Sequence, residues 1–254
     1  MPPSPSTTER WLAYREVNPR ARRRLFCFPY AGGGASTYRG WAAELPADVE
    51  VCPVQLPGRE SRLREPAFGE LQPLVKAAAD ALQPLFQLPF AFFGHGMGAA
   101  IAYGLACELR SRGRAWPEAL FVAGRRAPEV PLRGAPLHDL PDAELIAALR
   151  ERRAVPEEVL AHEELMRLLL PILRADLAVD ETASFGDEAK FAFALSAFVG
   201  REDDIAARAD VEPWAQRTVG AFRLRQLPGD QFFIHSSRAL LLEALARDLA
   251  QPAP

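Results

Sequence analysis

Short apolar runs alternate with helical stretches along this chain of 254 residues, and this alternation constrains the fold more than any other feature. We expect strands at 25–28, 49–54, 90–93, 119–122, 191–199 and 222–227. We expect helices at 36–45, 71–85, 98–110 and 233–249. Such alternation is typical of a parallel sheet covered by helices on both faces. The sequence therefore predicts the α/β class.

One segment, residues 137–182, interrupts the alternation. Apolar residues recur in it at helical spacing, and Pro156 and Pro171 interrupt the pattern. We interpret the segment as a helical lid inserted into a single domain of residues 9–254; additional packing helices are the alternative. Residues 1–8 are expected to form a disordered tail.

The composition narrows the class of protein. Hydrophobic residues make up 49% of the chain, enough for a sizeable core, and the net charge of −3 gives no indication of nucleic acid or an anionic membrane. No apolar run reaches the length of about 20 residues that spans a bilayer, and the first residues do not form a signal peptide. Cys27, Cys52 and Cys107 lie in apolar stretches, which predicts buried, reduced thiols in a cytoplasmic protein. No residues have metal-ligand spacing, and we expect no cofactor.

A glycine-rich turn, Gly94–Gly98, follows the apolar run at 90–93. Its spacing is that of the Gly-x-Ser-x-Gly nucleophile elbow, which raises a serine hydroxyl at the tip of a strand. Gly96 stands at the serine position, so this turn carries no side chain that could attack a carbonyl. Glycine also adopts the strained backbone of an elbow without the usual cost.

Eight blocks of sequence, in order along nearly the whole chain, carry a resemblance to a known family. The chain resembles the type II thioesterases of polyketide and nonribosomal peptide pathways, which have the α/β-hydrolase fold. The blocks are FPYAGGGAS (28–36), QLPGRESR (55–62), GHGMG (94–98), AGRRAP (123–128), LPDAELIAALR (140–150), LLLPILRADLAVDET (168–182), FVGREDD (198–204) and LPGDQFFIH (227–235). Members of this family release acyl groups from the phosphopantetheine arm of carrier proteins. The resemblance implies a monomer whose partner is an acyl-phosphopantetheine carrier protein or a polyketide-like small molecule.

The resemblance also assigns the positions of a catalytic triad. Asp203 occupies the acid position, with Asp204 as a weaker candidate, and Gln231 stands where the family has its histidine. Glycine cannot attack and an amide cannot accept a proton at neutral pH, so triad hydrolysis is excluded by Gly96 and Gln231 together. We expect the Gln231 amide to donate to Asp203, and we expect His235 to be a helix residue without a catalytic role.

Other parts of the site are expected to remain. The resemblance assigns the oxyanion-binding backbone N–H groups to Ala31 and to Met97, and backbone donors do not depend on side chains. Tyr30 is a candidate for lining the pocket. His95 and Asp230 are weaker catalytic candidates, because the first is expected to pack beneath the turn and the second to lie in a solvated loop.

Three functions remain open on the sequence. The first is a repurposed enzyme that carries out cyclisation, isomerisation or dehydration of a polyketide-like compound, with Asp203 or Asp230 moving a proton. The second is a noncatalytic pseudo-thioesterase that binds a carrier protein or a hydrophobic ligand. The third is a genuine thioesterase inactivated by mutation. Retention of the glycine loop, the 55–62 loop and the lid favours the first, and a reachable Asp203 beside Gly96 would support it.

Overall fold

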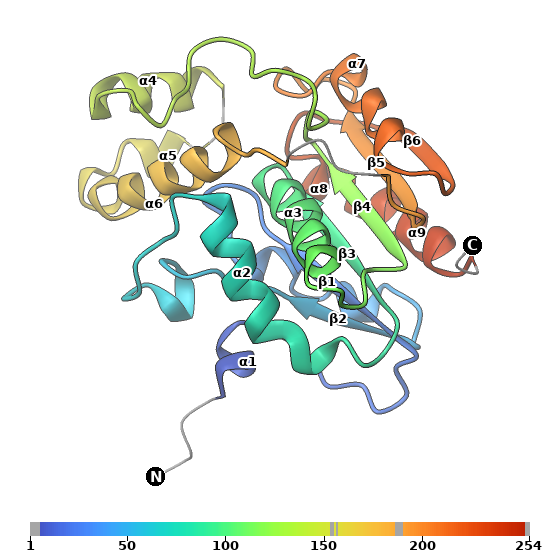
Figure 1. Ribbon diagram of the computed structural model, residues 1–254. Coiled ribbons are helices and arrows are strands. Elements are labelled where there is room, and N and C mark those ends of the chain that lie inside the picture. Colours follow the sequence, from blue (N-terminus) through green and yellow to red (C-terminus); the bar gives the residue numbers. More distant parts are fainter. Residues whose placement is uncertain (1–5, 153–154, 156, 186–189, 252–254) are drawn as a thin grey trace.

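The computed structural model describes residues 6–152, 155, 157–185 and 190–251, and its centre is one parallel sheet (Figure 1). The sheet has six strands in the order β2-β1-β3-β4-β5-β6, and every neighbouring pair is parallel. The strands are β1 (Arg23–Phe28), β2 (Val49–Pro53), β3 (Phe90–His95), β4 (Ala119–Ala123), β5 (Ala194–Gly200) and β6 (Phe222–Leu227). The predicted α/β class is confirmed.

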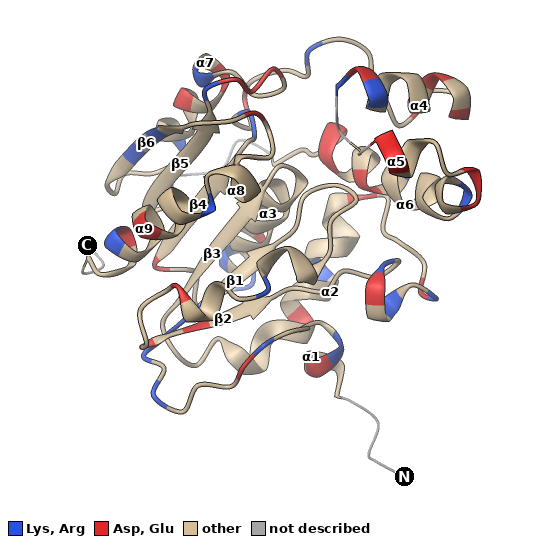
Figure 2. Cartoon of the chain, turned by 180° about the vertical axis from the view of Figure 1, so that it is seen from behind, with Lys and Arg blue, Asp and Glu red and all other residues tan. Residues whose placement is uncertain are grey.

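Helices cover both faces of this sheet, as Figure 1 and the view from behind in Figure 2 show. The α-helices are α1 (Thr7–Arg10), α2 (Leu71–Leu82), α3 (Met97–Ser111), α4 (Asp142–Glu151), α5 (Glu157–Leu160), α6 (Glu163–Glu181), α7 (Arg208–Val211), α8 (Phe233–Ser236) and α9 (Arg238–Leu249). Side chains of β1 alternate between the two faces: Phe26 and Phe28 pack in the cluster that includes α2 and α3, and Leu25 and Cys27 in the cluster that includes α9. All three cysteines are buried and free, as predicted.

Some predicted elements differ from the observed ones. The helix predicted at 36–45 is two short 3₁₀ turns, Ala35–Tyr38 and Trp41–Ala43, because Gly40 between them has a φ of 79° and ends the first turn. Thr7 and Thr8 were expected in the tail but belong to α1, whose first turn is capped by Ser6. Residues 1–5 and Pro156 lie outside the described residues.

The helices within residues 137–182, which we call the lid segment, pack on one another at one side of the sheet (Figure 1). Their apolar side chains form a cluster separate from the two sheet clusters: Leu137, Leu145, Leu149, Leu160, Met166, Leu170 and Leu173. The division of residues 9–254 into one domain with an inserted lid stays a prediction. No described helix has the length and apolar character needed to cross a membrane.

Candidate functional site

The turn between β3 and α3 has the geometry of a nucleophile elbow. Gly96 links the two elements with a φ of 53° and a ψ of −120°. A Cβ atom on Gly94 would lie 2.1 Å from the carbonyl oxygen of Gly98, and one on Gly98 would lie 2.0 Å from that of Phe28. A Cβ atom on Gly96 would meet only the Cβ of Tyr30, at 3.6 Å. The two flanking glycines are therefore required by packing, whereas the space at Gly96 is open to a side chain.

Two backbone N–H groups remain available beside this open space. Met97 is the first residue of α3, so its N–H has no partner within the helix and points from the positive end of the helix dipole. Across the described part of the chain, no hydrogen bond occupies the N–H of Ala31. The next two N–H groups are used: Gly32 donates to Asp176 Oδ2 at 2.7 Å and Gly33 to the Tyr30 carbonyl at 2.9 Å. The glycine loop is thus held in place by Gly32 and Gly33, and the described residues offer the N–H of Ala31 no partner.

The acid candidate, Asp203, is enclosed after the end of β5. Its Oδ1 accepts hydrogen bonds from the N–H groups of Ile205 and Ala206, both at 2.9 Å, and its buried Oδ2 has no partner among the described residues. Burial raises the pKa of Asp203, and the neighbouring charge of Asp230 raises it further. Asp230 itself is exposed and accepts from the Phe232 N–H at 2.8 Å, which caps its own turn. Each carboxyl group thus accepts hydrogen bonds within its own turn.

The expectation that Gln231 donates to Asp203 is wrong. Gln231 Nε2 donates instead to the carbonyl of Arg152, at 2.9 Å, just beyond the end of α4. The last carbonyls of a helix have no partner within it, so an amide donor close to that end is favourable. Asp203, in contrast, already has its Oδ1 satisfied by its own turn. Gln231 therefore contacts the lid segment.

His95 also contacts the loop that carries Gln231. Its Nε2 lies 2.7 Å from the Gln231 carbonyl oxygen, and since a carbonyl can only accept, Nε2 carries the proton. Burial lowers the pKa of His95 to about 4, which keeps the ring neutral at pH 7. The side chain is 3% exposed and its Nδ1 has no partner in the described chain. His95 thus holds the Gln231 loop and does not face a ligand.

Tyr30 pairs with a residue that the sequence analysis set aside. Its hydroxyl lies 3.0 Å from Nε2 of His235, and its ring packs edge-on against Phe232 and His95 at centroid distances of 5.4 and 5.7 Å. Burial raises the pKa of Tyr30 and lowers that of His235, with the Arg238 charge lowering the latter further. Both groups are therefore neutral at pH 7. No sequence signal links two residues 205 positions apart, so this pair is visible only in the fold.

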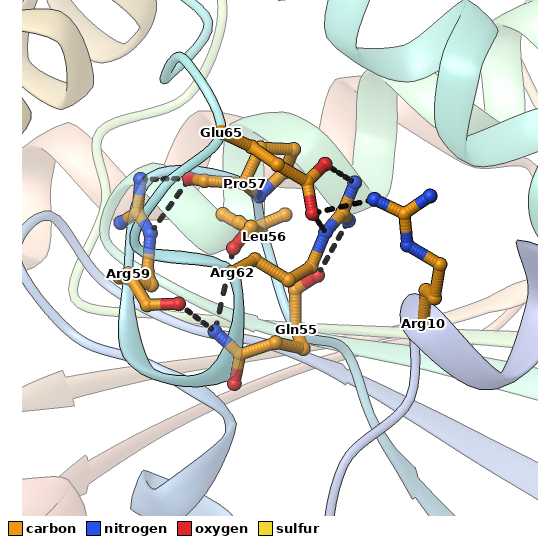
Figure 3. A network of polar contacts seen from close by, with 7 residues as sticks. All are labelled: Arg10, Gln55, Leu56, Pro57, Arg59, Arg62 and Glu65. Atoms are coloured by element: carbon orange, nitrogen blue, oxygen red, sulfur yellow. Dashed lines mark hydrogen bonds and ion pairs between the residues drawn. The ribbon is translucent and has the colours of Figure 1, made fainter. Parts of the chain in front are cut away.

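The 55–62 loop, which belongs to the resemblance, is held by a network of polar contacts (Figure 3). Gln55 Nε2 donates to the Arg59 carbonyl at 3.1 Å, and Arg62 Nη1 donates to the Gln55 carbonyl at 3.0 Å. Arg62 also pairs with Glu65, as does Arg10, and these guanidinium groups, Arg62 first, lower the pKa of Glu65 to about 2. The network fixes the backbone from which Arg59 projects.

Two ion pairs connect the second half of α6 to the rest of the chain. Arg59 makes a bidentate contact with Asp176, at 2.5 and 2.7 Å, and both side chains are buried. One turn further, Asp180 pairs with Arg125, whose pKa burial lowers to about 9. Sequence analysis missed these four residues, although all lie in blocks that carry the resemblance. The Asp176 contact places α6 directly against the glycine loop.

Two cavities lie away from the elbow. One, of about 90 Å³, is lined by residues that include Arg23, Ala119 and Asp248; the other, of about 370 Å³, lies between the ends of α2 and α3. Neither is lined by an elbow residue.

A parallel sheet covered by helices, with an elbow between β3 and α3 and two free N–H groups beside it, defines a protein of the α/β-hydrolase type. The thioesterase domain model matches residues 23–251, and the chain belongs to the thioesterase domain family. It is 40% identical over 244 residues to the gramicidin S biosynthesis protein GrsT of Aneurinibacillus migulanus, covering 96% of this chain and 95% of that protein.

Solved structures agree with this assignment. The RedJ thioesterase of the prodiginine pathway in Streptomyces coelicolor is 41% identical with a TM-score of 0.84, covering 91% of this chain and 88% of that one. The type II thioesterase BorB of the borrelidin biosynthetic cluster is 34% identical, also with a TM-score of 0.84, covering 94% and 97%. The chain is therefore a type II thioesterase-like protein, similar to proteins of polyketide and nonribosomal peptide pathways.

Proposed function

We propose that this protein binds an acyl thioester at its elbow and does not hydrolyse it through an acyl-enzyme. The observation that carries the proposal is the retained elbow: Gly96 keeps the backbone conformation and the open space of a nucleophile position without a nucleophile. The resemblance to type II thioesterases makes an acyl group on a phosphopantetheine arm, presented by a carrier protein, the natural ligand. Among the functions open on the sequence, this is the noncatalytic pseudo-thioesterase.

Binding without cleavage follows from the groups around the open space. The thioester carbonyl can accept hydrogen bonds from the N–H groups of Ala31 and Met97, as in an oxyanion hole. Attack on it needs a nucleophile and a base, and neither Gly96 nor the amide of Gln231 supplies one. Asp203 cannot substitute, because its side chain is buried and engaged with its own turn. The carbonyl is therefore held in a polarised but stable state.

The second candidate is the repurposed, non-hydrolytic enzyme, which the contact between Tyr30 and His235 favours. A tyrosine hydroxyl hydrogen-bonded to a neutral imidazole can give or take a proton, and this pair lies beside the elbow. In this version Tyr30 moves a proton during cyclisation, isomerisation or dehydration of a polyketide-like ligand, a role for which Asp203 or Asp230 was expected from the motifs.

The first test restores the two lost groups. We expect native protein to bind decanoyl-pantetheine saturably in calorimetry and to release free thiol at the uncatalysed rate. The double variant Gly96→Ser/Gln231→His should release thiol at least about a hundredfold faster than the native protein, because a general base alone contributes about 10²–10⁴-fold. The unpartnered Oδ2 of Asp203 is the acceptor that a histidine at position 231 needs.

Matched controls keep this test specific. Each single variant should stay close to the native rate, since a serine without a base and a histidine without a nucleophile are both ineffective. Adding Asp203→Asn to the double variant should remove most of the gain. Native protein that releases thiol at enzymatic rates, or that fails to bind the thioester, contradicts the proposal. Conversion of the ligand to a product of equal mass, or lighter by one water, supports the second candidate.

A further inference from the structure

The lid segment is attached to the rest of the chain unevenly. The second half of α6 is anchored by the buried pair of Asp176 with Arg59 and by the pair of the partly exposed Asp180 with the buried Arg125. The part formed by α4 and α5 has no such ion pair with the sheet domain among the described residues. The bond from Gln231 Nε2 to the Arg152 carbonyl is the only hydrogen bond that the described residues make between this part and the sheet domain. The second half of α6 is thus bound to the sheet domain by ion pairs, whereas α4 and α5 touch that domain by one hydrogen bond and are otherwise tied to α6, through the Asp142–Arg174 pair.

Helix α6 has a weak point between these two parts of the lid segment. Pro171 lies inside α6 and removes a backbone donor there, which weakens the helix locally. Before this proline, α6 contributes Met166 and Leu170 to the lid's own apolar cluster. After it come the two anchoring aspartates. The first half of α6 shares this small core with α4 and α5, and Leu173 and the Arg174–Asp142 pair connect the core to the anchored half.

Gln231, which makes the contact with α4, is itself held firmly by the sheet domain. Gln231 is fixed at its backbone by His95, whose Nε2–H donates to the Gln231 carbonyl at 2.7 Å. Its side-chain amide then donates to the end of α4, where the helix dipole is negative and a donor is favoured. The donor is essential, since a carboxylate of the same shape would present only acceptors to a carbonyl.

We propose that Gln231 is a positioning residue that latches the lid segment over the elbow and thereby sets how fast a ligand enters and leaves. One residue at the histidine position of the family both removes the catalytic base and supplies the latch. The ligand in this inference rests on the proposed function, whereas the latch itself does not, and the two are tested separately.

The latch is tested first without ligand. Spin labels at Glu144→Cys on α4 and Ala239→Cys on α9 report the distance between lid and sheet domain by double electron–electron resonance; both positions are exposed, and the native cysteines are buried. Loss of one hydrogen bond should raise the population of the longer, open distance about 2- to 10-fold in Gln231→Glu. Gln231→Met, which also lacks the donor but adds no charge, should give the same change.

The control is Gln226→Glu, the same chemical change at an exposed position of β6, and it should leave the distance distribution as in the native protein. Ligand exchange is then measured by stopped flow with decanoyl-pantetheine, where both Gln231 variants should raise the association and dissociation rates together. Unchanged distances between the spin labels in both Gln231 variants would overturn the latch proposal. A wider distance distribution with no binding of decanoyl-pantetheine to the native protein or to either variant supports the latch and overturns the proposed function alone.

Discussion

The three glycines of the elbow differ in whether packing requires them to be glycine. Gly94 and Gly98 are fixed by backbone atoms about 2 Å from any Cβ they could carry, so they are signatures of the turn. Gly96 has no such neighbour, so packing does not require it to be glycine. The flanking glycines therefore indicate the fold, and the central one bears on the proposed loss of hydrolysis. His95, between them, is buried and hydrogen-bonded to the Gln231 carbonyl.

His95 should make stability depend on pH. Burial lowers its pKa from 6.5 to about 4, so the unfolded chain takes up a proton at a higher pH than the folded one. Its contribution is therefore fully present above pH 6.5 and is lost as the pH falls to about 4. The lost part is at most about 3 kcal/mol. Urea unfolding at several pH values should show this decrease in native protein and a flatter profile in His95→Gln.

The control for this profile is His162→Asn, because His162 is exposed and asparagine keeps its capping role at α6. This variant should retain the native pH dependence. A His95→Gln profile as steep as the native one would mean that other groups account for the acid sensitivity.

At the scale of elements, α6 depends on a buried charge pair for its position. Asp176→Asn leaves the Arg59 guanidinium buried without its anion, and we expect this to lower the free energy of unfolding by about 3–5 kcal/mol. Replacing both partners, as in Arg59→Met/Asp176→Leu, should cost clearly less because no charge stays buried. Glu157→Gln, which breaks the exposed pair with Arg150, should change the free energy of unfolding by less than about 1 kcal/mol. Equal losses for Asp176→Asn and Glu157→Gln in denaturant unfolding would argue against this role.

Elements were predictable where local pattern decides them. The apolar runs predicted all six strands, because a strand buried on both faces, such as β3, reads as a continuous apolar run. The bounds of β6 also match at both ends, although it is an edge strand whose side chains are mostly half-buried. The helix predicted at 36–45 failed because Gly40 adopts a positive φ that helical spacing does not reveal. The partner of Gln231 and the pairing of Tyr30 with His235 were not predictable, since each joins segments far apart in the chain. The contacts between distant segments could therefore be found only from the structure, whereas the positions of the motifs could be found from the sequence.

At the scale of the whole molecule, the described residues form three apolar clusters, and the one in the lid segment is separate from the two that cover the sheet. Charged residues of both signs are interspersed over the helices in Figure 2, in keeping with the small net charge. A separate core predicts separate local stability, because cooperative units follow shared apolar contacts.

This separation can be measured by native-state hydrogen exchange. Leu145 is fully buried in the lid cluster, and Leu145→Ala should destabilise that cluster by about 2–5 kcal/mol. We expect amides of α4 and of the first half of α6 to exchange faster, while those of β3 and β4 keep their native rates. Ile101→Ala, a comparable truncation in α3, should instead accelerate exchange in β3 and β4 as well. If Leu145→Ala accelerates exchange in the strands as much as in α4, lid and sheet unfold as one unit, and opening of the lid would then require loosening of the whole molecule.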